Sequence, residues 1–363
     1  MRTRAIVQHG PGRLELSELA VPEIDDDSAL LRVEACGVCG TDVEQYAGLI
    51  PARFPLVPGH EPVGVIDRIG ERASARWGVK TGDRVAVENY LPCAHCTPCL
   101  EGRYPRCEGR EGNFGYGHIG LAHPPGIWGA FSEYMHLDPA SILHPLSPDV
   151  PASVATLFNP LGAGYRWAIE IGGVKPGHTV VILGAGQRGI AAAIAARAAG
   201  AEHVIMTGLS SDAHKLQLAR RLGVDDVVDV EADDTFTRVF ELTNGRCADV
   251  VIEVASSAPQ PVIDAMHCAK AGGTVVLAGL KGFKPIPDFV SDYVVIKELT
   301  VKGVFAVTNR AYRWAVGLLE AGTLPLELLH THDFALADTE LAIRTLAGEI
   351  AGEHPIHCSV VPP

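Results

Sequence analysis

The stretch that decides the fold of the second half of the chain reads Thr-Val-Val-Ile-Leu-Gly-Ala-Gly-Gln-Arg-Gly, residues 179–189. Its first five residues form an apolar run typical of a buried strand, and the residues that follow it, up to Ala199, favour helix. Gly184 permits a tight turn, Gly186 lets a pyrophosphate approach the backbone, and Gly189 allows the helix to pack closely on the strand. Because a helix N-terminus attracts phosphate, the stretch predicts a dinucleotide-binding turn.

Strands and helices continue to alternate after this stretch. The strand-like segments are residues 203–207, 227–228, 249–254 and 274–278. The helix-like segments are residues 212–222, 235–242 and 261–270. This alternation is typical of a doubly wound parallel sheet, so we predict an α/β fold for this part of the chain.

The first 150 residues follow a different pattern. Short strand-like runs at residues 4–7, 29–34, 63–69 and 84–87 are broken by Gly and Pro, and helical periodicity is scarce. We therefore predict a small β-rich, barrel-like domain that displays loops. Two amphipathic stretches (311–321 and 338–347) and a closing strand (356–361) lack partners that could extend the parallel sheet. We expect them to return to the β-rich domain, which gives one domain of residues 1–158 with 303–363 and one of residues 159–302.

Composition excludes several classes of function. The chain has 363 residues, of which 47% are hydrophobic and 20% are charged, and no apolar run reaches the roughly 18 residues that a membrane span needs. The start, Met1-Arg-Thr-Arg4, lacks the apolar core of a signal peptide, so we expect a cytoplasmic protein without a membrane partner. The net charge of -13 and the absence of a Lys/Arg cluster disfavour nucleic acid as a partner.

Metal ligands are suggested by a segment in the β-rich part. Residues 34–42 read Glu-Ala-Cys-Gly-Val-Cys-Gly-Thr-Asp, and Gly-His-Glu follows at residues 59–61. A thiolate at Cys39 and an imidazole at His60, with carboxylates at Asp42 and Glu61, form a ligand set expected of zinc. Most of the other histidines, including His118, are interpreted as ordinary loop or surface residues.

A second cysteine cluster predicts another metal. Four thiolates at Cys93, Cys96, Cys99 and Cys107 can close tetrahedrally around zinc and leave no open position, which defines a structural site. His95 lies within the cluster but is redundant beside four thiolates. A zinc protein that binds nucleic acid is disfavoured by the charge balance.

The choice between NAD and NADP stays open, with a slight preference for NAD. The strand after the glycine turn ends at Gly208, where an acidic residue usually holds the adenosine ribose. Without that acid a 2′-phosphate is not repelled, and Ser210, Ser211, His214 or Lys215 could contact one, yet Asp212 could still reach a ribose. The residues predicted to contact the dinucleotide are Gly184, Gly186, Gln187, Arg188, Gly189, Gly208, Ser210, Lys215, Ala255, Gly279, Leu280 and Phe305.

Taken together, the motifs resemble those of the zinc-containing medium-chain alcohol and polyol dehydrogenases. The matching pieces are residues 36–42, 59–61, 79–85, the four-cysteine cluster and residues 184–189, and the likeness covers essentially the whole chain. The resemblance implies a GroES-like catalytic domain, a Rossmann domain, NAD(P), two zinc ions per chain and a homodimer or homotetramer. It also implies that Cys39 and His60 hold a catalytic zinc, with Glu61 either a ligand or behind the metal.

Two positions depart from the family pattern. The third zinc ligand, usually Cys, Glu or Gln, falls on Asn159, so Glu61 or water could complete the shell. The relay histidine of many members is replaced by Glu44. The residues predicted to take part in catalysis are therefore Cys39, Thr41, Asp42, Glu44, His60, Glu61 and Asn159, with Thr41 accepting the substrate proton and Asp42 orienting His60.

The resemblance predicts reversible hydride transfer between an alcohol and NAD(P), giving a ketone or aldehyde. The long aromatic segment 113–128, with Leu280 and Phe305, indicates either an apolar pocket for a bulky or secondary alcohol or a surface or subunit-contact loop. Two other functions are considered: a polyol or sugar dehydrogenase, and a non-catalytic NAD(P)-binding scaffold that has lost turnover.

Overall fold

The computed structural model describes the chain except residues 111–114, and it divides into two compact units. The first comprises Met1–Asn159 and Thr308–Pro363, and the second comprises Pro160–Val307. The predicted boundaries, after residues 158 and 302, lie close to these. Among the described residues, no helix has the length and apolar character needed to cross a membrane.

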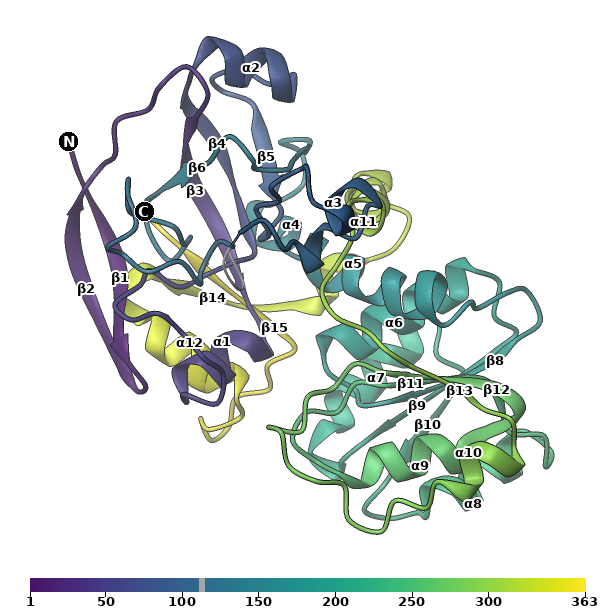
Figure 1. Cartoon of the computed structure of the whole chain (residues 1–363). Helices are drawn as coiled ribbons and strands as arrows, with labels where there is room; N and C mark the ends of the chain where they lie inside the picture. The colour runs from purple at the N-terminus through teal and green to yellow at the C-terminus, as the bar shows by residue number, and fades with distance from the viewer. Residues whose placement is uncertain (111–114) are drawn as a thin grey trace. The chain divides into compact units, whose positions relative to one another are not determined.

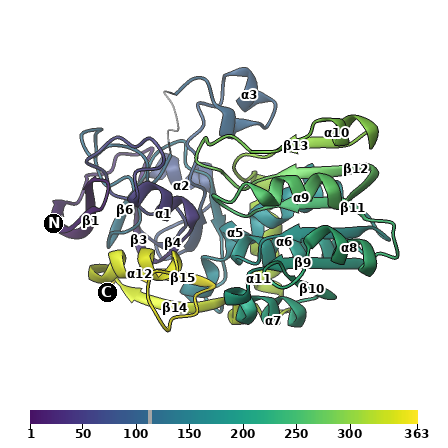
Figure 2. The same ribbon diagram turned by 90° about the horizontal axis from the view of Figure 1, so that it is seen from below.

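The second unit is built on a six-stranded sheet in the order β10-β9-β8-β11-β12-β13, in which every neighbouring pair is parallel. Figure 2 shows β10 and β13 at the two edges. The strands are β8 (Thr179–Leu183), β9 (His203–Gly208), β10 (Asp226–Asp229), β11 (Ala248–Glu253), β12 (Ala269–Leu277) and β13 (Thr300–Gly303). The helices are α6 (Gln187–Ala198), α7 (Ala213–Arg221), α8 (Thr235–Leu242), α9 (Gln260–Cys268) and α10 (Asp292–Ile296), preceded by a π-helical turn at Arg166–Ile171. The predicted doubly wound α/β fold is confirmed.

Small side chains let α6 lie against this sheet. Residues 189–196 of α6 are all buried, and five of them are alanine, so the helix axis can approach the strands closely. The strand that precedes it, β8, is buried over its last four residues. The apolar character of residues 179–199 therefore reflects a strand and a helix that are buried in the protein. Strands of parallel sheets are generally buried in this way.

The first unit contains a seven-stranded sheet with the order β14-β15-β3-β4-β5-β7, in which β6 pairs with β3, and a separate antiparallel pair, β1 with β2 (Figure 1). The strands are β1 (Arg2–Gly10), β2 (Arg13–Ala20), β3 (Ala29–Val38), β4 (Pro62–Ile69), β5 (Arg84–Val87), β6 (Tyr134–Leu137), β7 (Leu143–Pro145), β14 (His330–Ala335) and β15 (His357–Val361). The helices are α1 (Gly40–Tyr46), α2 (Glu71–Trp77), α3 (Thr97–Leu100), α4 (Ala152–Ala155), α11 (Asn309–Ala321) and α12 (Thr339–Leu346), and α5 (Phe158–Tyr165) spans the boundary between the units.

The C-terminal segments belong to the first unit, as their sequence pattern indicated. Strand β15 pairs antiparallel with β3 and parallel with β14. Strand β14 was not predicted from the sequence. Its residues, His-Thr-His-Asp-Phe-Ala, alternate between half-buried and exposed, but few of them are apolar.

The aromatic segment that follows the cysteine cluster contributes to the core of the first unit. Tyr116, Ile119 and Trp128 are buried in the same apolar cluster as Phe131 and Met135. The interpretation of this segment as a surface loop is therefore wrong for these three side chains, which are buried, and its interpretation as a pocket wall stays a prediction. Residues 113 and 114 lie outside the described residues.

Candidate functional site

The pairing of β3 with β4 brings the two halves of the first metal motif together. Cys36 lies opposite Pro62 in this antiparallel pair, so the residues just after β3 and just before β4 are neighbours. Cys39 is the residue before α1, and His60 precedes β4 by two residues. Both side chains are buried. Cys39 and His60, which are 21 residues apart in sequence, are therefore in contact in the fold.

Three side chains form a compact group at this place. The Sγ of Cys39 lies 3.2 Å from Nε2 of His60, and Nδ1 of His60 lies 3.4 Å from Oδ1 of Asp42. The other carboxylate oxygen of Asp42 accepts the backbone N–H of Cys39 at 2.8 Å. One ligand atom from each of the three residues lies within 4.8 Å of the others. Asp42 thereby holds both the backbone of Cys39 and the imidazole of His60 in place.

The electrostatics of this group favour a cation. Burial alone would raise the pKa of Asp42, but the charge of His60 and the hydrogen bonds from His60 and Cys39 outweigh it, and the pKa of Asp42 is lowered. Burial likewise opposes a charge on His60, yet Asp42 and Cys39 raise its pKa well above the usual value. Two buried anionic groups around one imidazole are the setting in which a divalent cation binds.

The donor set and its spacing fit zinc. With Zn–S of about 2.3 Å and Zn–N of about 2.0 Å, a tetrahedral ion holds sulfur and nitrogen about 3.5 Å apart. The 3.2 Å between Cys39 Sγ and His60 Nε2 needs to open by only a few tenths of an ångström. Asp42 faces the other ring nitrogen, so it holds His60 in place instead of sharing the ion, the arrangement common for metal-bound histidines.

The other predicted catalytic residues lie at different places around this group. Glu61 is fully buried, and its Oε2 lies 2.6 Å from the point where a Cβ on Gly37 would stand. Asn159 is buried, and its side-chain amide donates to the hydroxyl of Tyr312 at 3.2 Å. Thr41 and Glu44 are half-buried on α1. Glu61 is not a member of the compact group of Cys39, Asp42 and His60.

One further histidine lies beside the metal group. The ring of His118 lies 5.4 Å from the ring of His60, and its Nδ1 is 2.9 Å from the side-chain oxygen of Gln45. Burial and the charge of His60 lower the pKa of His118 to about 4. His118 lies in a turn and is not a member of either metal group, as predicted, but its contact with the ring of His60 was not predicted, because only the fold brings the two rings together.

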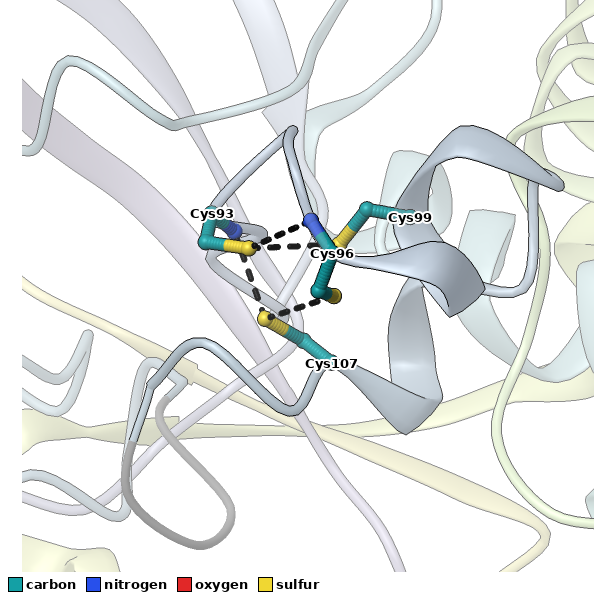
Figure 3. Close-up of side chains that lie close together, drawn as sticks. All are labelled: Cys93, Cys96, Cys99 and Cys107. Carbon is teal, nitrogen blue, oxygen red and sulfur yellow. Dashed lines mark hydrogen bonds between the residues drawn. The ribbon is translucent and has the colours of Figure 1, made fainter.

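The four cysteines of the second cluster converge on one point (Figure 3). The Sγ atoms of Cys93 and Cys99 are 3.9 Å apart, and those of Cys96 and Cys107 are 4.0 Å apart. A tetrahedral ion with Zn–S of about 2.3 Å separates its sulfur ligands by about 3.8 Å. The spacing therefore fits zinc with almost no movement. His95 is exposed and its Nδ1 contacts the carbonyl of Cys93, away from a ligand role.

Backbone N–H groups also prepare these thiols for a metal. The N–H of Glu108 lowers the pKa of Cys96 to about 6, and the N–H of His95 lowers the pKa of Cys93. Burial raises the pKa of Cys99 to about 12. Thiolates are the ligand form of cysteine, so the loop favours two of them before any metal arrives.

The glycine turn of the second unit has the geometry expected of a phosphate cradle. Gly184 has a φ of +122°, and a Cβ on Gly189 would lie 2.0 Å from the carbonyl oxygen of Gly184. A Cβ on Gly186 would meet nothing within 4 Å, so the backbone there is open to approach. Gly186 caps α6, whose first residues are Gln187 and Arg188. The turn and the helix N-terminus together fit a pyrophosphate.

The remaining predicted dinucleotide residues lie at the carboxyl ends of the strands. Ala255 follows β11, and its backbone nitrogen is 3.3 Å from the Cβ position of Gly184. Gly208 ends β9, and a Cβ there would touch Ala185, Leu216 and Asp212. In parallel sheets, ligands bind at these strand ends.

Carboxylates surround the loop after β9. Ser210 donates from Oγ to Asp229 at 2.7 Å and from its backbone nitrogen to Glu231 at 2.8 Å. Lys215 is paired with Asp212 at 2.7 Å. Of the four side chains offered as contacts for a 2′-phosphate, Ser210 and Lys215 are thus held by acids.

The last three predicted dinucleotide residues follow strands β12 and β13. Gly279 and Leu280 follow β12, and a Cβ on Gly279 would lie 2.4 Å from the carbonyl of Ala255. The side chain of Leu280 is exposed, and Phe305 is half-buried after β13.

Comparison with known proteins agrees with this geometry. The family model Alcohol dehydrogenase GroES-like domain matches residues 25–148, and the model Zinc-binding dehydrogenase matches residues 189–321. The chain is 46% identical to a probable alcohol dehydrogenase of Mycobacterium tuberculosis over 99% of this chain and 98% of that protein. It is 31% identical to the erythritol/L-threitol dehydrogenase of Mycolicibacterium smegmatis, again over 99% and 98%.

A solved structure shows the same fold. A Sinorhizobium meliloti protein described as a zinc-binding dehydrogenase, bound to NADP, superposes with a TM-score of 0.86, 27% identity and full coverage of both chains. The resemblance inferred from the sequence is therefore confirmed. With its GroES-like and zinc-binding dehydrogenase regions and its full-length relatives, the chain belongs to the zinc-type medium-chain dehydrogenase/reductase family.

Proposed function

We propose that this oxidoreductase, which acts on a CH–OH group with zinc and NAD(P), interconverts a secondary alcohol and its ketone at the group formed by Cys39, Asp42 and His60. The observation that carries the proposal is the buried thiolate–imidazole pair, 3.2 Å apart, with Asp42 behind the imidazole. Zinc held by Cys39 and His60 would act as a Lewis acid that lowers the pKa of an alcohol hydroxyl.

In this proposal, side chains of the protein accept the substrate proton and orient the zinc ligand His60. Thr41 lies in the first turn of α1, two residues after Cys39, and its hydroxyl accepts the proton of the alcohol. Asp42 orients His60 and balances its charge, because one carboxylate oxygen faces Nδ1 of His60 and the other accepts the backbone N–H of Cys39. Glu44, one turn further along α1, takes the place of the relay histidine and passes the proton to solvent. Glu61, Asn159 or water completes the ligand shell.

A nicotinamide dinucleotide supplies the hydride acceptor, and we assign NAD to this role. The turn formed by Gly184, Gly186 and Gly189 would hold its pyrophosphate. Asp212, Asp229 and Glu231 surround the loop after β9, and three carboxylates would repel a 2′-phosphate. Free ribose hydroxyls would instead find acceptors there.

Two zinc ions per chain complete this proposal. The first belongs to the catalytic group and the second to Cys93, Cys96, Cys99 and Cys107, where four thiolates leave no position for substrate (Figure 3). None of the nine cysteines forms a disulfide, which supports a cytoplasmic, reducing location.

The functional form in this proposal is a homodimer or homotetramer. Strand β13 is an edge strand of the parallel sheet, and its four residues are exposed. Large apolar side chains of the preceding segment are exposed as well: Phe283 by 90%, Val295 by 73% and Ile296 by 80%. An unpaired strand edge beside apolar side chains is the kind of surface that a second copy covers.

A panel of alcohols assayed with NAD and NADP tests the function. We expect NAD-dependent oxidation of secondary alcohols, two zinc ions per chain by elemental analysis, and loss of both activity and one zinc in Cys39→Ser. Val43→Ala, a change on the same helix outside the metal group, serves as the control. A non-catalytic scaffold would bind the dinucleotide but turn over no alcohol, and a single zinc that survives Cys39→Ser would contradict the catalytic assignment.

A further inference from the structure

Two buried glutamine side chains form a hydrogen-bonded chain that ends at His118. Gln45 donates from Nε2 to the carbonyl of Gly117 at 3.3 Å and to the side-chain oxygen of Gln8 at 3.2 Å. Gln8 donates from its own Nε2 to the carbonyls of Gln45 at 3.1 Å and Gly10 at 3.4 Å. Backbone carbonyls can only accept hydrogen bonds, so the orientation of both amide groups is fixed.

This chain determines which nitrogen of His118 carries the proton. The amide nitrogen of Gln45 is already used as a donor, so its oxygen faces Nδ1 of His118 at 2.9 Å. An amide oxygen is an acceptor, and Nδ1 must therefore be the N–H donor. At pH 7.5, above the ordinary histidine pKa of about 6.5, the ring is neutral and Nε2 carries a lone pair. Among the described residues, the hydrogen bonding of His118 is confined to Nδ1.

The lone pair belongs to a ring that is packed against the metal group. The rings of His118 and His60 are 5.4 Å apart and tilted by 34°. Gly117, with a φ of +79°, brings the segment close, since a Cβ there would lie 3.0 Å from Cβ of His60. His118 thus places a neutral ring with an accepting Nε2 beside His60. The hydrogen bond from Nδ1 to Gln45 keeps the proton on Nδ1 and off Nε2.

We propose that His118 is a specificity-determining residue, whose Nε2 accepts a hydrogen bond from a second hydroxyl on the carbon next to the reacting one. The preferred substrates are then vicinal diols and the matching hydroxyketones. This inference rests on the proposed function. The ring of His118 is half-buried, and a simple alcohol offers its Nε2 no donor and gains no hydrogen bond there. The aromatic side chains that had indicated an apolar pocket, Tyr116 and Trp128, are core residues and do not oppose a polar contact.

The tautomer is measured without any substrate. Nitrogen-15 NMR of the zinc-loaded protein at pH 7.5 identifies the ring signals of His118 as those lost in His118→Phe. We expect a proton on Nδ1 and none on Nε2. In Gln45→Met the acceptor is gone and the proton moves in part to Nε2. A proton on Nε2 in the wild-type protein would overturn the inference.

The specificity is measured with butane-2,3-diol and butan-2-ol, which differ by one hydroxyl. In His118→Phe we expect the ratio of kcat/KM for the diol to that for the alcohol to fall about tenfold, the effect of one hydrogen bond. Gln45→Met should lower it in the same direction. His136→Phe, a change at a different histidine that is buried, should leave the ratio unaltered.

Two results separate a packing role of His118 from an absence of dehydrogenase activity. An unchanged ratio in His118→Phe, with both substrates slowed equally, would reduce His118 to a packing residue and leave the dehydrogenase intact. A wild-type protein that oxidises no alcohol with either dinucleotide would overturn the proposed function, and the diol specificity with it.

Discussion

Among single residues, Asp42 is predicted to decide how well His60 can serve as a ligand in the proposed zinc site. Its carboxylate accepts from Cys39 N–H and faces His60 Nδ1, so it fixes the orientation of the imidazole and balances its charge. Asp42→Asn keeps the shape but removes the charge. We expect zinc affinity or kcat/KM to fall by about 10- to 100-fold. Chelator competition and steady-state kinetics measure this, with Asp67→Asn at the surface as the control; equal values for the two variants would contradict the assigned role.

A second residue, His136, makes the stability of the first unit depend on pH. It is buried, packs edge-on against Trp128 at 5.1 Å, and burial lowers its pKa to about 4. In the unfolded chain the pKa is about 6.5, so between these values the unfolded state binds more protons. The contribution of the neutral ring is therefore complete above about pH 6.5 and is lost as the pH falls toward 4.

We expect the wild-type protein to lose about 1 kcal/mol more free energy of unfolding than His136→Phe between pH 7.5 and 5.5. Urea unfolding at the two pH values measures the difference. Because the other titrating groups are common to both proteins, they cancel in the comparison. Equal losses would show that His136 titrates normally in the fold.

At the scale of elements, the cysteine loop depends on a close approach between Gly109 and Cys93. A Cβ on Gly109 would lie 2.5 Å from Sγ of Cys93, so Gly109→Ala must displace a ligand. We expect the zinc content to fall from two to one per chain and the melting temperature to drop by several degrees. Gly317→Ala, in α11 where a Cβ meets nothing within 4 Å, is the matched control. Retention of both ions in Gly109→Ala would contradict the four-thiolate site.

At the scale of the whole molecule, the exposed edge of the parallel sheet predicts self-association. Ile296→Asp places a charge among apolar side chains beside β13, which a covering subunit could not solvate. We expect light scattering to show a homodimer or homotetramer for the wild-type protein and smaller species for the variant. Leu49→Asp, at an exposed apolar position in the first unit, should leave the assembly intact. A wild-type monomer would refute the prediction.

Local patterns of sequence were enough to predict most of the elements. Residues 179–183 and 235–242 were assigned with the bounds of β8 and α8, because an apolar run or an amphipathic period reports burial directly. The short helix α1 was not predicted, since its seven residues offer too few turns for a periodic pattern. Strand β14 was missed because pairing with β15, and not its own composition, holds it in place.

The sequence by itself determined the α/β class, the glycine turn and the four-cysteine cluster, because each is written in residues that are neighbours along the chain. The place of Asp42 behind His60 was predicted from the sequence, whereas the burial of Tyr116 and Trp128 in the core and the contacts of Gln45 with Gln8 and His118 became visible only in the folded chain. The two glutamine contacts join residues that are 37 and 73 positions apart in sequence. Spacing along the chain carries no information about such pairs, since sheet pairing and burial alone bring them together.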